Sequence, residues 1–274
     1  MRPDIHLYQI AYDEESAKLV QASGFLLLDN MANQRPDWYE YWPIRRFLLN
    51  GQMDESALYG FFSPKFTAKT GLSKTDVEGF IASELAKSPI DVALFCPQPD
   101  MGANFLNVFE QAEVFDNGFI EATSEFLKLQ SIEFPLNSVV MDTRQIVYSN
   151  YFVARPRFWR AWFALTEALF GIAEDVNHPL HQSINHRTNY PNNASRKIFI
   201  LERMASLLLT INPEFRVAAA NPYGFGWSMT RFRESPDRTY INDALKRAYR
   251  DTGFPQYIDA FKNLRAELLQ PSQN

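Results

Sequence analysis

Short apolar runs alternate with helix-like patterns along the chain, and this alternation constrains the fold more than any other sequence feature. Short apolar runs bounded by turn residues are typical of buried strands, whereas apolar stripes at helical spacing are typical of amphipathic helices. Strands separated by helices favour a mainly parallel sheet, so we expect an α/β domain. The runs predicted to be strands are residues 5–10, 25–28, 58–62, 92–95, 139–141, 147–154 and 215–219.

Several residues mark the expected helix starts. Ser73 and Asp76 form a Ser-x-x-Asp capping pattern before an apolar stripe. Pro99 is expected to open a helix that continues to residue 112, and Pro156 fits the first position of another helix. A further apolar stripe at helical spacing covers residues 198–208.

The chain shows no internal repeat and no low-complexity linker. We expect residues 1–220 to form the main domain and residues 221–274 to form a helical extension with two amphipathic helices. The polar stretch at 178–195 is rich in Asn and His and lacks periodicity. A loop of that length is usually functional or disordered.

Charge and cysteine content narrow the function classes. The net charge is −5, so we expect no nucleic-acid partner. Arginine clusters at 45–46 and 155–160 suit a phosphate-bearing small molecule, an anionic membrane surface or solvated helix ends. The single Cys96 excludes an internal disulfide and favours a reducing compartment. We find neither a signal-peptide pattern nor a bilayer-length apolar run, and therefore expect a cytoplasmic protein, at most peripheral to the inner membrane.

No motif of high specificity is present. The sequence has no Gly-rich dinucleotide fingerprint, no phosphate-binding P-loop, no His-Glu-x-x-His and no nucleophile elbow. Several large enzyme classes are therefore not favoured.

Polar residues follow four of the predicted strands. In open α/β sheets, ligands bind outside the carboxyl ends of the strands. Turns favour the same residue types for backbone reasons, so each strand end has both interpretations. The residues at these ends are Asp29 and Asn30, then Ser63 and Lys65, then Gln98 and Asp100, then Asp142, Thr143 and Arg144.

Aromatic, acidic and basic residues are interleaved most densely at residues 33–46. Sugars offer apolar ring faces to aromatic side chains, and a diphosphate suits bidentate arginine. We therefore take Trp38, Tyr39 and Trp42 as candidate sugar contacts and Arg45 as a candidate phosphate contact. A partly buried turn with Trp42 as a core anchor is the alternative interpretation.

Glu202 lies at the edge of the apolar stripe at 198–208 and is followed by Arg203. A carboxylate in that position can serve as a general base or form an ordinary ion pair. His186 is one of three histidines in the polar loop, and their spacing is poor for a metal site. Substrate contact and solvent exposure both remain open for His186.

Three stretches appear in a recognisable order. Residues 41–44 read Tyr-Trp-Pro-Ile, and Asn150 begins a strand-like run that leads through Arg155 into a Phe- and Trp-rich helix. Arg196 precedes an apolar run that leads to Glu202 and Arg203. Together, over residues 5–220, they resemble bacterial glycosyltransferases with a GT-A-like fold, most closely the galactofuranosyltransferase domains of surface-polysaccharide clusters.

The resemblance implies a GT-A-like catalytic domain over residues 1–220, a nucleotide-diphosphate-sugar donor and a lipid-linked glycan acceptor. It also implies that Glu202 and Arg203 belong to the active centre and that the product is a capsule or O-antigen polysaccharide. Many GT-A enzymes hold a divalent metal with an Asp-x-Asp motif. Here residues 96–100 read Cys-Pro-Gln-Pro-Asp, so we expect no protein-built metal site and leave open whether Mg²⁺ or Mn²⁺ takes part.

The resulting hypothesis is an inverting sugar transfer. Glu202, or in second place Asp100, takes the acceptor proton, and Arg203 completes the catalytic set. Arg45, Lys65 and Arg144 neutralise the departing diphosphate, and these charged residues are expected to meet in one pocket. Asp29 and Asn30 also contact the donor. The remaining predicted substrate contacts are Trp38, Tyr39, Trp42, Gln98, Asn150 and His186.

Two other functions remain open at this point. One is pentose-phosphate transfer from phosphoribosyl diphosphate to a glycan, which would use the same cations. The other is a non-catalytic glycan-binding or assembly protein whose C-terminal helices contact a partner. The sequence also allows a homo-oligomer.

Overall fold

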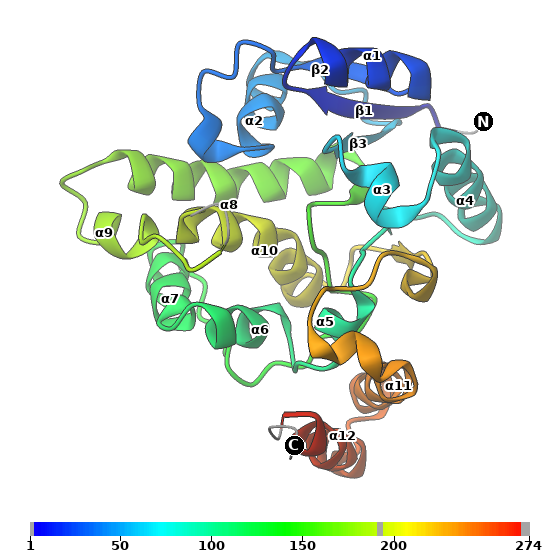
Figure 1. Ribbon diagram of the computed structural model, residues 1–274, viewed down its shortest axis with the longest axis vertical. Coiled ribbons are helices and arrows are strands. Elements are labelled where there is room, and N and C mark those ends of the chain that lie inside the picture. Colours follow the sequence, from blue (N-terminus) through cyan, green and yellow to red (C-terminus); the bar gives the residue numbers. More distant parts are fainter. Residues whose placement is uncertain (1–2, 191–193, 270–274) are drawn as a thin grey trace.

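The computed structural model describes residues 3–190 and 194–269. This part of the chain contains a six-stranded sheet (Figure 1). Its strand order is β2-β1-β3-β5-β4-β6, and every strand is parallel to its neighbours except β5, which is antiparallel to β3 and β4. The predicted α/β class with a mainly parallel sheet is confirmed. The strands are β1 (Ile5–Ala11), β2 (Leu26–Asp29), β3 (Leu58–Phe62), β4 (Val92–Leu94), β5 (Phe152–Ala154) and β6 (Val217–Ala219).

Helices flank this sheet and make up most of the molecule. They are α1 (Glu14–Ser23), α2 (Tyr41–Asn50), α3 (Phe66–Thr70), α4 (Lys74–Lys87), α5 (Pro99–Ala103), α6 (Val108–Phe115), α7 (Phe119–Leu129), α8 (Pro156–Glu174), α9 (His181–Ile184), α10 (Arg196–Ile211), α11 (Pro236–Thr252) and α12 (Pro255–Leu269). Short 3-10 turns lie at Pro36–Trp38, Pro222–Gly224 and Arg231–Glu234. The predicted Ser73–Asp76 capping box opens α4, and Pro156 is the first residue of α8, as expected.

Both faces of the sheet are covered by apolar side chains. Along β3, Tyr59 and Phe61 face the core that α8 and α10 cover, whereas Leu58 and Phe62 face the core under α3 and α4. This alternation is the period-2 pattern of a strand buried on both sides. Gly60 lies at the centre of β3, where an added Cβ would be 2.9 Å from Cγ2 of Val153. The close approach of β5 therefore requires glycine there.

Three expected elements differ from the structure. Of the strand expected over 147–154, only Phe152–Ala154 forms β5. Residues 139–141 form no strand; their backbone is held by the Asn107 side chain, which donates to the Val139 carbonyl at 2.7 Å. Asn107 is also the N-cap of α6, so the single helix expected over 99–112 is two helices, α5 and α6. Asparagine breaks the helix because its side chain satisfies the free amides of Phe109 and Glu110.

The segment after β6 packs onto α5 through buried polar contacts. Lys246 of α11 donates to the carbonyls of Gly102 and Phe105, both at 2.7 Å, and Asn242 donates to Asn104 at 2.7 Å. Figure 1 shows α11 and α12 at the end of the molecule opposite α1 and β2. The helical character of this extension is confirmed up to residue 269, residues 270–274 lie outside the described part, and the domain boundary at 220 stays a prediction.

We expect Lys246 to make stability depend on pH. Burial lowers the pKa of Lys246 from 10.5 to about 8. The unfolded chain keeps the higher pKa, so unfolding takes up a proton between these values and the contribution of Lys246 to stability improves as pH rises from 8 toward 10.5. From about pH 7 to about pH 10, the unfolding free energy of the wild type should rise by about 2 kcal/mol relative to Lys246→Met.

Urea denaturation of both proteins at each pH measures this difference. Other titrating groups are common to the two proteins and cancel. A difference that stays constant over this pH range would contradict the assignment.

The polar stretch at 178–195 contains the short helix α9 and leads into α10. Residues 191–193 lie outside the described part. Among the described helices, none has the length and apolar character that crossing a bilayer requires.

Candidate functional site

The strand order places a topological switch point between β1 and β3. After β1 the chain passes through α1 to β2 on one side, whereas β3 pairs with the other side of β1. In open α/β sheets, the crevice outside the carboxyl ends at such a point is where ligands bind. Tyr12 directly follows β1, and Ser63 and Lys65 directly follow β3.

The turn before β5 reaches the same edge of the sheet, because β5 runs antiparallel to its neighbours. Ser149 and Asn150 in this turn have φ values of 60° and 53°, in the left-handed region that non-glycine residues rarely adopt. The Ser149 amide donates to the Glu202 carboxylate, and Lys69 Nζ donates to Ser149 Oγ at 2.8 Å. Strained backbone that the surroundings hold in this way is concentrated at functional sites.

Near this turn, the charges of one carboxylate and two lysines act on a second carboxylate, Glu40. Burial raises the pKa of Glu40, the negative charge of Glu202 raises it further, and Lys69 and Lys65 act in the opposite direction. Glu40 precedes α2 and Glu202 lies on α10, whereas both lysines lie at α3. Side chains from separate parts of the chain are therefore close enough to Glu40 to shift its pKa.

Tyrosines and an asparagine line the same cluster. Burial, together with the charge of Glu40, raises the pKa values of Tyr12 and Tyr151. Tyr151 and Ser63 hydrogen-bond through their hydroxyls at 2.6 Å. Within the described residues, Tyr12 Oη and Asn150 Oδ1 are buried without a hydrogen-bond partner. Buried polar atoms are nearly always paired, so two unpaired ones are unusual and distinguish this part of the structure.

We call Tyr12, Glu40, Lys65, Lys69, Asn150, Tyr151 and Glu202 the carboxylate–lysine cluster. Three of its members, Lys65, Asn150 and Glu202, were expected from the sequence. Tyr39 borders it, with a φ of 47°, and contributes to the raised pKa of Tyr12.

Arg203 is buried next to Glu202 and does not belong to the cluster. Its guanidinium donates to the Val108 carbonyl at 2.7 Å and to the Gln111 side chain at 2.5 Å, and it is 4% exposed. One of its nitrogens is 3.8 Å from Oε2 of Glu202. Arg203 therefore helps to position Glu202, and its burial prevents the direct catalytic contact that we expected.

Asp100 does not belong to the cluster. It is fully buried, and its carboxylate accepts hydrogen bonds from the backbone amide of Ser228, at 3.0 Å, and from the Ser228 hydroxyl. It therefore ties α5 to the chain after β6. The expectation that Asp100 is a second catalytic base is wrong, because substrate cannot reach it.

The expected phosphate contacts Arg45 and Arg144 are engaged elsewhere. Arg45 forms a bidentate pair with Glu167 of α8, at 2.7 and 2.5 Å. Arg144 pairs with Asp142 and with Asp251 of α11, each at 2.7 Å. The expectation of one pocket containing Arg45, Lys65, Arg144, Asp100 and Glu202 is therefore wrong.

The aromatic stretch is mainly scaffold. Trp38 is fully buried and donates from Nε1 to Glu174 at 3.0 Å. Trp42 is partly buried and stacks on Phe170 of α8, with centroids 6.3 Å apart. These contacts favour the core-anchor interpretation for both tryptophans over the expected sugar contact.

The residues at the end of β2 act mainly as turn formers. Asp29 is exposed, and its carboxylate accepts from the Met31 amide at 2.8 Å. This is the local hydrogen bond for which turns favour Asp. Asn30 is 1% exposed, and its Oδ1 has no partner within the described part of the chain. This contact of Asp29 is local to the turn, so its expected role in donor binding stays a prediction.

Gln98 and His186 are not members of the carboxylate–lysine cluster. Gln98 has a φ of 61° and precedes α5, where its amide donates to the Gly226 carbonyl at 2.7 Å. His186 is exposed, and its carbonyl accepts from the Arg196 amide at 2.8 Å. Their predicted substrate contacts stay untested predictions.

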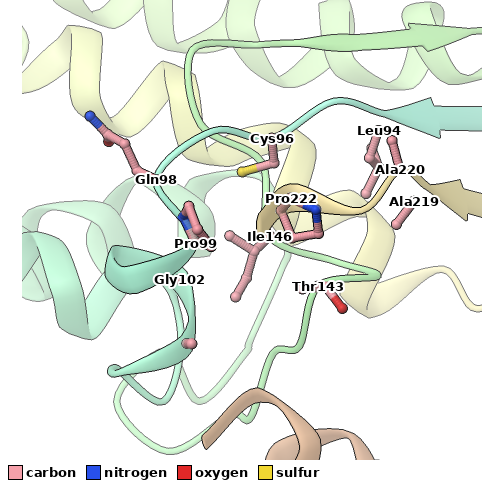
Figure 2. Close-up of a pocket in the computed structure, with 11 residues that line it drawn as sticks. Leu94, Cys96, Gln98, Pro99, Gly102, Thr143, Ile146, Ala219, Ala220 and Pro222 are labelled. Atoms are coloured by element: carbon pink, nitrogen blue, oxygen red, sulfur yellow. The ribbon is translucent and has the colours of Figure 1, made fainter. Parts of the chain in front are cut away.

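A small pocket lies next to Gln98, between β4, α5 and β6 (Figure 2). Cys96, Pro99, Ile146 and Pro222 are among its lining residues, and the Gln98 side chain extends away from its centre. Its volume is about 20 Å³, which is room for a single water molecule. This pocket therefore cannot hold a sugar or a nucleotide.

Over 3–190 and 194–269, no group of three or more His, Cys, Asp or Glu side chains is arranged to hold a metal ion. Participation of Mg²⁺ or Mn²⁺ carried by a donor diphosphate stays open.

Comparison of the chain with protein-family models, with curated proteins and with solved structures found no match. The resemblance to glycosyltransferases therefore stays a prediction, and function is argued below from the side chains of the cluster.

Sequence reasoning missed Tyr12, Glu40, Lys69 and Tyr151. Two signals were present: Lys69 follows Lys65 by four residues, one helical turn away, and Tyr12 directly follows a predicted strand. Glu40 lies in the stretch at 33–46 where aromatic, acidic and basic residues are interleaved. Only the influence of Glu202, which is distant in the sequence, distinguishes Glu40 from the other polar residues there.

Proposed function

We propose that this protein is a glycosyltransferase that moves a sugar from a nucleotide-diphosphate donor to a hydroxyl group of a glycan. The observation that carries the proposal is that the charges of Glu202, Lys65 and Lys69 act on Glu40 near the switch point of an α/β sheet. A base beside two cations suits a reaction in which a hydroxyl loses a proton while a diphosphate leaves. That the glycan is a lipid-linked surface polysaccharide is an expectation from the resemblance alone.

In this proposal Glu40 is the general base. Its raised pKa gives it a high affinity for the acceptor proton, and Glu202, fixed by the Ser149 amide, orients the reacting hydroxyl. The acceptor oxygen bonds to the anomeric carbon as the bond from that carbon to the diphosphate breaks. The proton passes to Glu40, and the diphosphate leaves beside Lys65 and Lys69. The anomeric configuration is inverted, because one displacement occurs.

The lysines provide a binding test. Lys65→Ala and Lys69→Ala should each weaken binding of a nucleoside diphosphate by roughly tenfold, which corresponds to about 1.4 kcal/mol. Isothermal titration calorimetry measures this effect. Lys128→Ala, at an exposed position of α7, is the matched control and should bind as the wild type does. Unchanged affinity in both cluster variants would remove the lysines from the donor site.

The alternative functions are separated by the choice of ligand. Thermal-shift measurements with nucleoside-diphosphate sugars, phosphoribosyl diphosphate and oligosaccharides should show stabilisation by the first class. Stabilisation by phosphoribosyl diphosphate alone would favour pentose-phosphate transfer. Oligosaccharide binding without any donor turnover would favour a glycan-binding protein.

A further inference from the structure

Strand β2 is an exposed edge of the sheet. It pairs with β1 on one side only, so its other row of backbone amides and carbonyls has no strand partner in the described chain. Proteins usually protect such edges by keeping them short or with charged residues, proline or a bulge. β2 is short and ends at Asp29, but its other three residues are leucines, and Leu26 and Leu27 are 41% and 47% exposed.

An apolar groove runs along this edge. It has a volume of about 730 Å³ and lies between the outer flank of α1 and β2. Leu26, Leu27 and Met31 form its strand side, and Met31 is 43% exposed. Glu14 and Lys18 lie on its helix side, so the rim carries charges of both signs. Figure 1 shows α1 and β2 together at one extreme of the molecule.

The exposed edge of β2 is complementary to the same edge of a second copy of the chain. Phe25 and Leu28 belong to the cores on opposite faces of the sheet, so Leu27 lies on the α1 face and Leu26 on the other. In an antiparallel pair, directly opposite residues share a face. A two-fold axis through Leu27 would therefore pair Leu27 with its own copy and Leu26 with Leu28, so that each leucine of β2 meets a leucine.

The same axis arranges the helices. It keeps both copies of α1 on one face of the joined sheet and sets them antiparallel and side by side. Glu14 and Lys18 lie one turn apart on the groove side of α1, so two antiparallel copies of α1 present opposite charges to each other. Two such pairs form by symmetry, so charge complementarity also favours a second copy as the occupant.

We propose that this chain forms a two-fold dimer through antiparallel pairing of β2 with β2 of a second copy. The pairing joins the two sheets into one continuous sheet and covers the groove beside α1. This proposal is independent of the proposed sugar transfer.

Sedimentation velocity of the 274-residue chain over a range of concentrations tests the dimer. The wild type should show a monomer–dimer equilibrium. Leu27→Lys places two ammonium groups at the axis and should weaken dimerisation at least about tenfold. Leu129→Lys, at a 55% exposed leucine of α7, is the matched control and should dimerise as the wild type does. Thermal denaturation checks that both variants fold.

A charge exchange tests the register. Glu14→Lys and Lys18→Glu should each weaken the dimer, and the double variant should restore it. A wild type that is monomeric up to millimolar concentration, or a dimer that Leu27→Lys leaves unchanged, would overturn the proposal. Failure of the double variant to recover would overturn the two-fold register.

Discussion

Glu40→Gln should lower the turnover number of sugar transfer by about 10² to 10⁴-fold, the range that general base catalysis contributes. Glutamine keeps the size of the side chain but cannot take the acceptor proton. The donor should still bind, because Lys65 and Lys69 are unchanged. Transfer of radiolabelled sugar from a nucleoside-diphosphate donor, under saturating conditions, measures the effect.

Two further variants define the roles of the carboxylates. Glu202→Gln should also abolish most transfer, because it disturbs the carboxylate that the Ser149 amide holds. Glu125→Gln, at an exposed position of α7, is the control and should turn over at the wild-type rate. Wild-type turnover in Glu40→Gln would remove Glu40 from the mechanism, and wild-type turnover in Glu202→Gln would remove Glu202.

The pH dependence of turnover gives an independent readout. Burial and Glu202 raise the pKa of Glu40 above 4.5, so its base form is lost on acidification at a higher pH than for an ordinary glutamate. Turnover should therefore fall on the acid side with an apparent pKa above 4.5. Lys65→Met should move this limb to higher pH, since Lys65 lowers the pKa of Glu40. An unchanged limb in Lys65→Met would contradict the geometry of the cluster.

Asp116→Ala should lower the free energy of unfolding by about 3 to 5 kcal/mol, the cost of leaving a buried charge without its partner. Arg196 forms a bidentate pair with Asp116, with both contacts at 2.7 Å, and the two side chains are 7% and 9% exposed. Arg196 is the first residue of α10, the helix that carries Glu202. Chemical denaturation monitored by circular dichroism measures the loss.

The Arg160–Glu55 pair is a matched control. It has the same bidentate geometry, at 2.6 and 2.8 Å, but its side chains are 55% and 67% exposed. Because solvent screens an exposed pair, Glu55→Ala should change stability far less than Asp116→Ala. Equal effects of the two substitutions would show that burial does not determine the contribution of the Arg196 pair.

Comparison of sequence and structure shows which features local chemistry determines. Ser73 and Pro156 mark the starts of α4 and α8, because capping and proline geometry act within one helical turn. The parallel strands were predicted by buried apolar runs, because a strand covered on both faces has to be apolar throughout. Where a side chain competes with the local pattern, as Asn107 does, prediction failed.

The site depended on contacts that no local pattern records. Glu202 and Lys65 were expected from the sequence, but Glu40 acquires its role only because the fold brings it beside Glu202, 162 residues away in the chain. Asp100 was predicted to be catalytic, but in the structure its carboxylate accepts hydrogen bonds from Ser228, which lies 128 residues later in the chain. The sequence by itself determined most of the strands, several helix starts and the α/β class, since these depend on neighbouring residues. The tertiary structure decided which polar groups stay accessible. The charge state and the hydrogen-bond partners of a side chain depend on the groups that lie next to it in the folded chain, and these are often distant in the sequence.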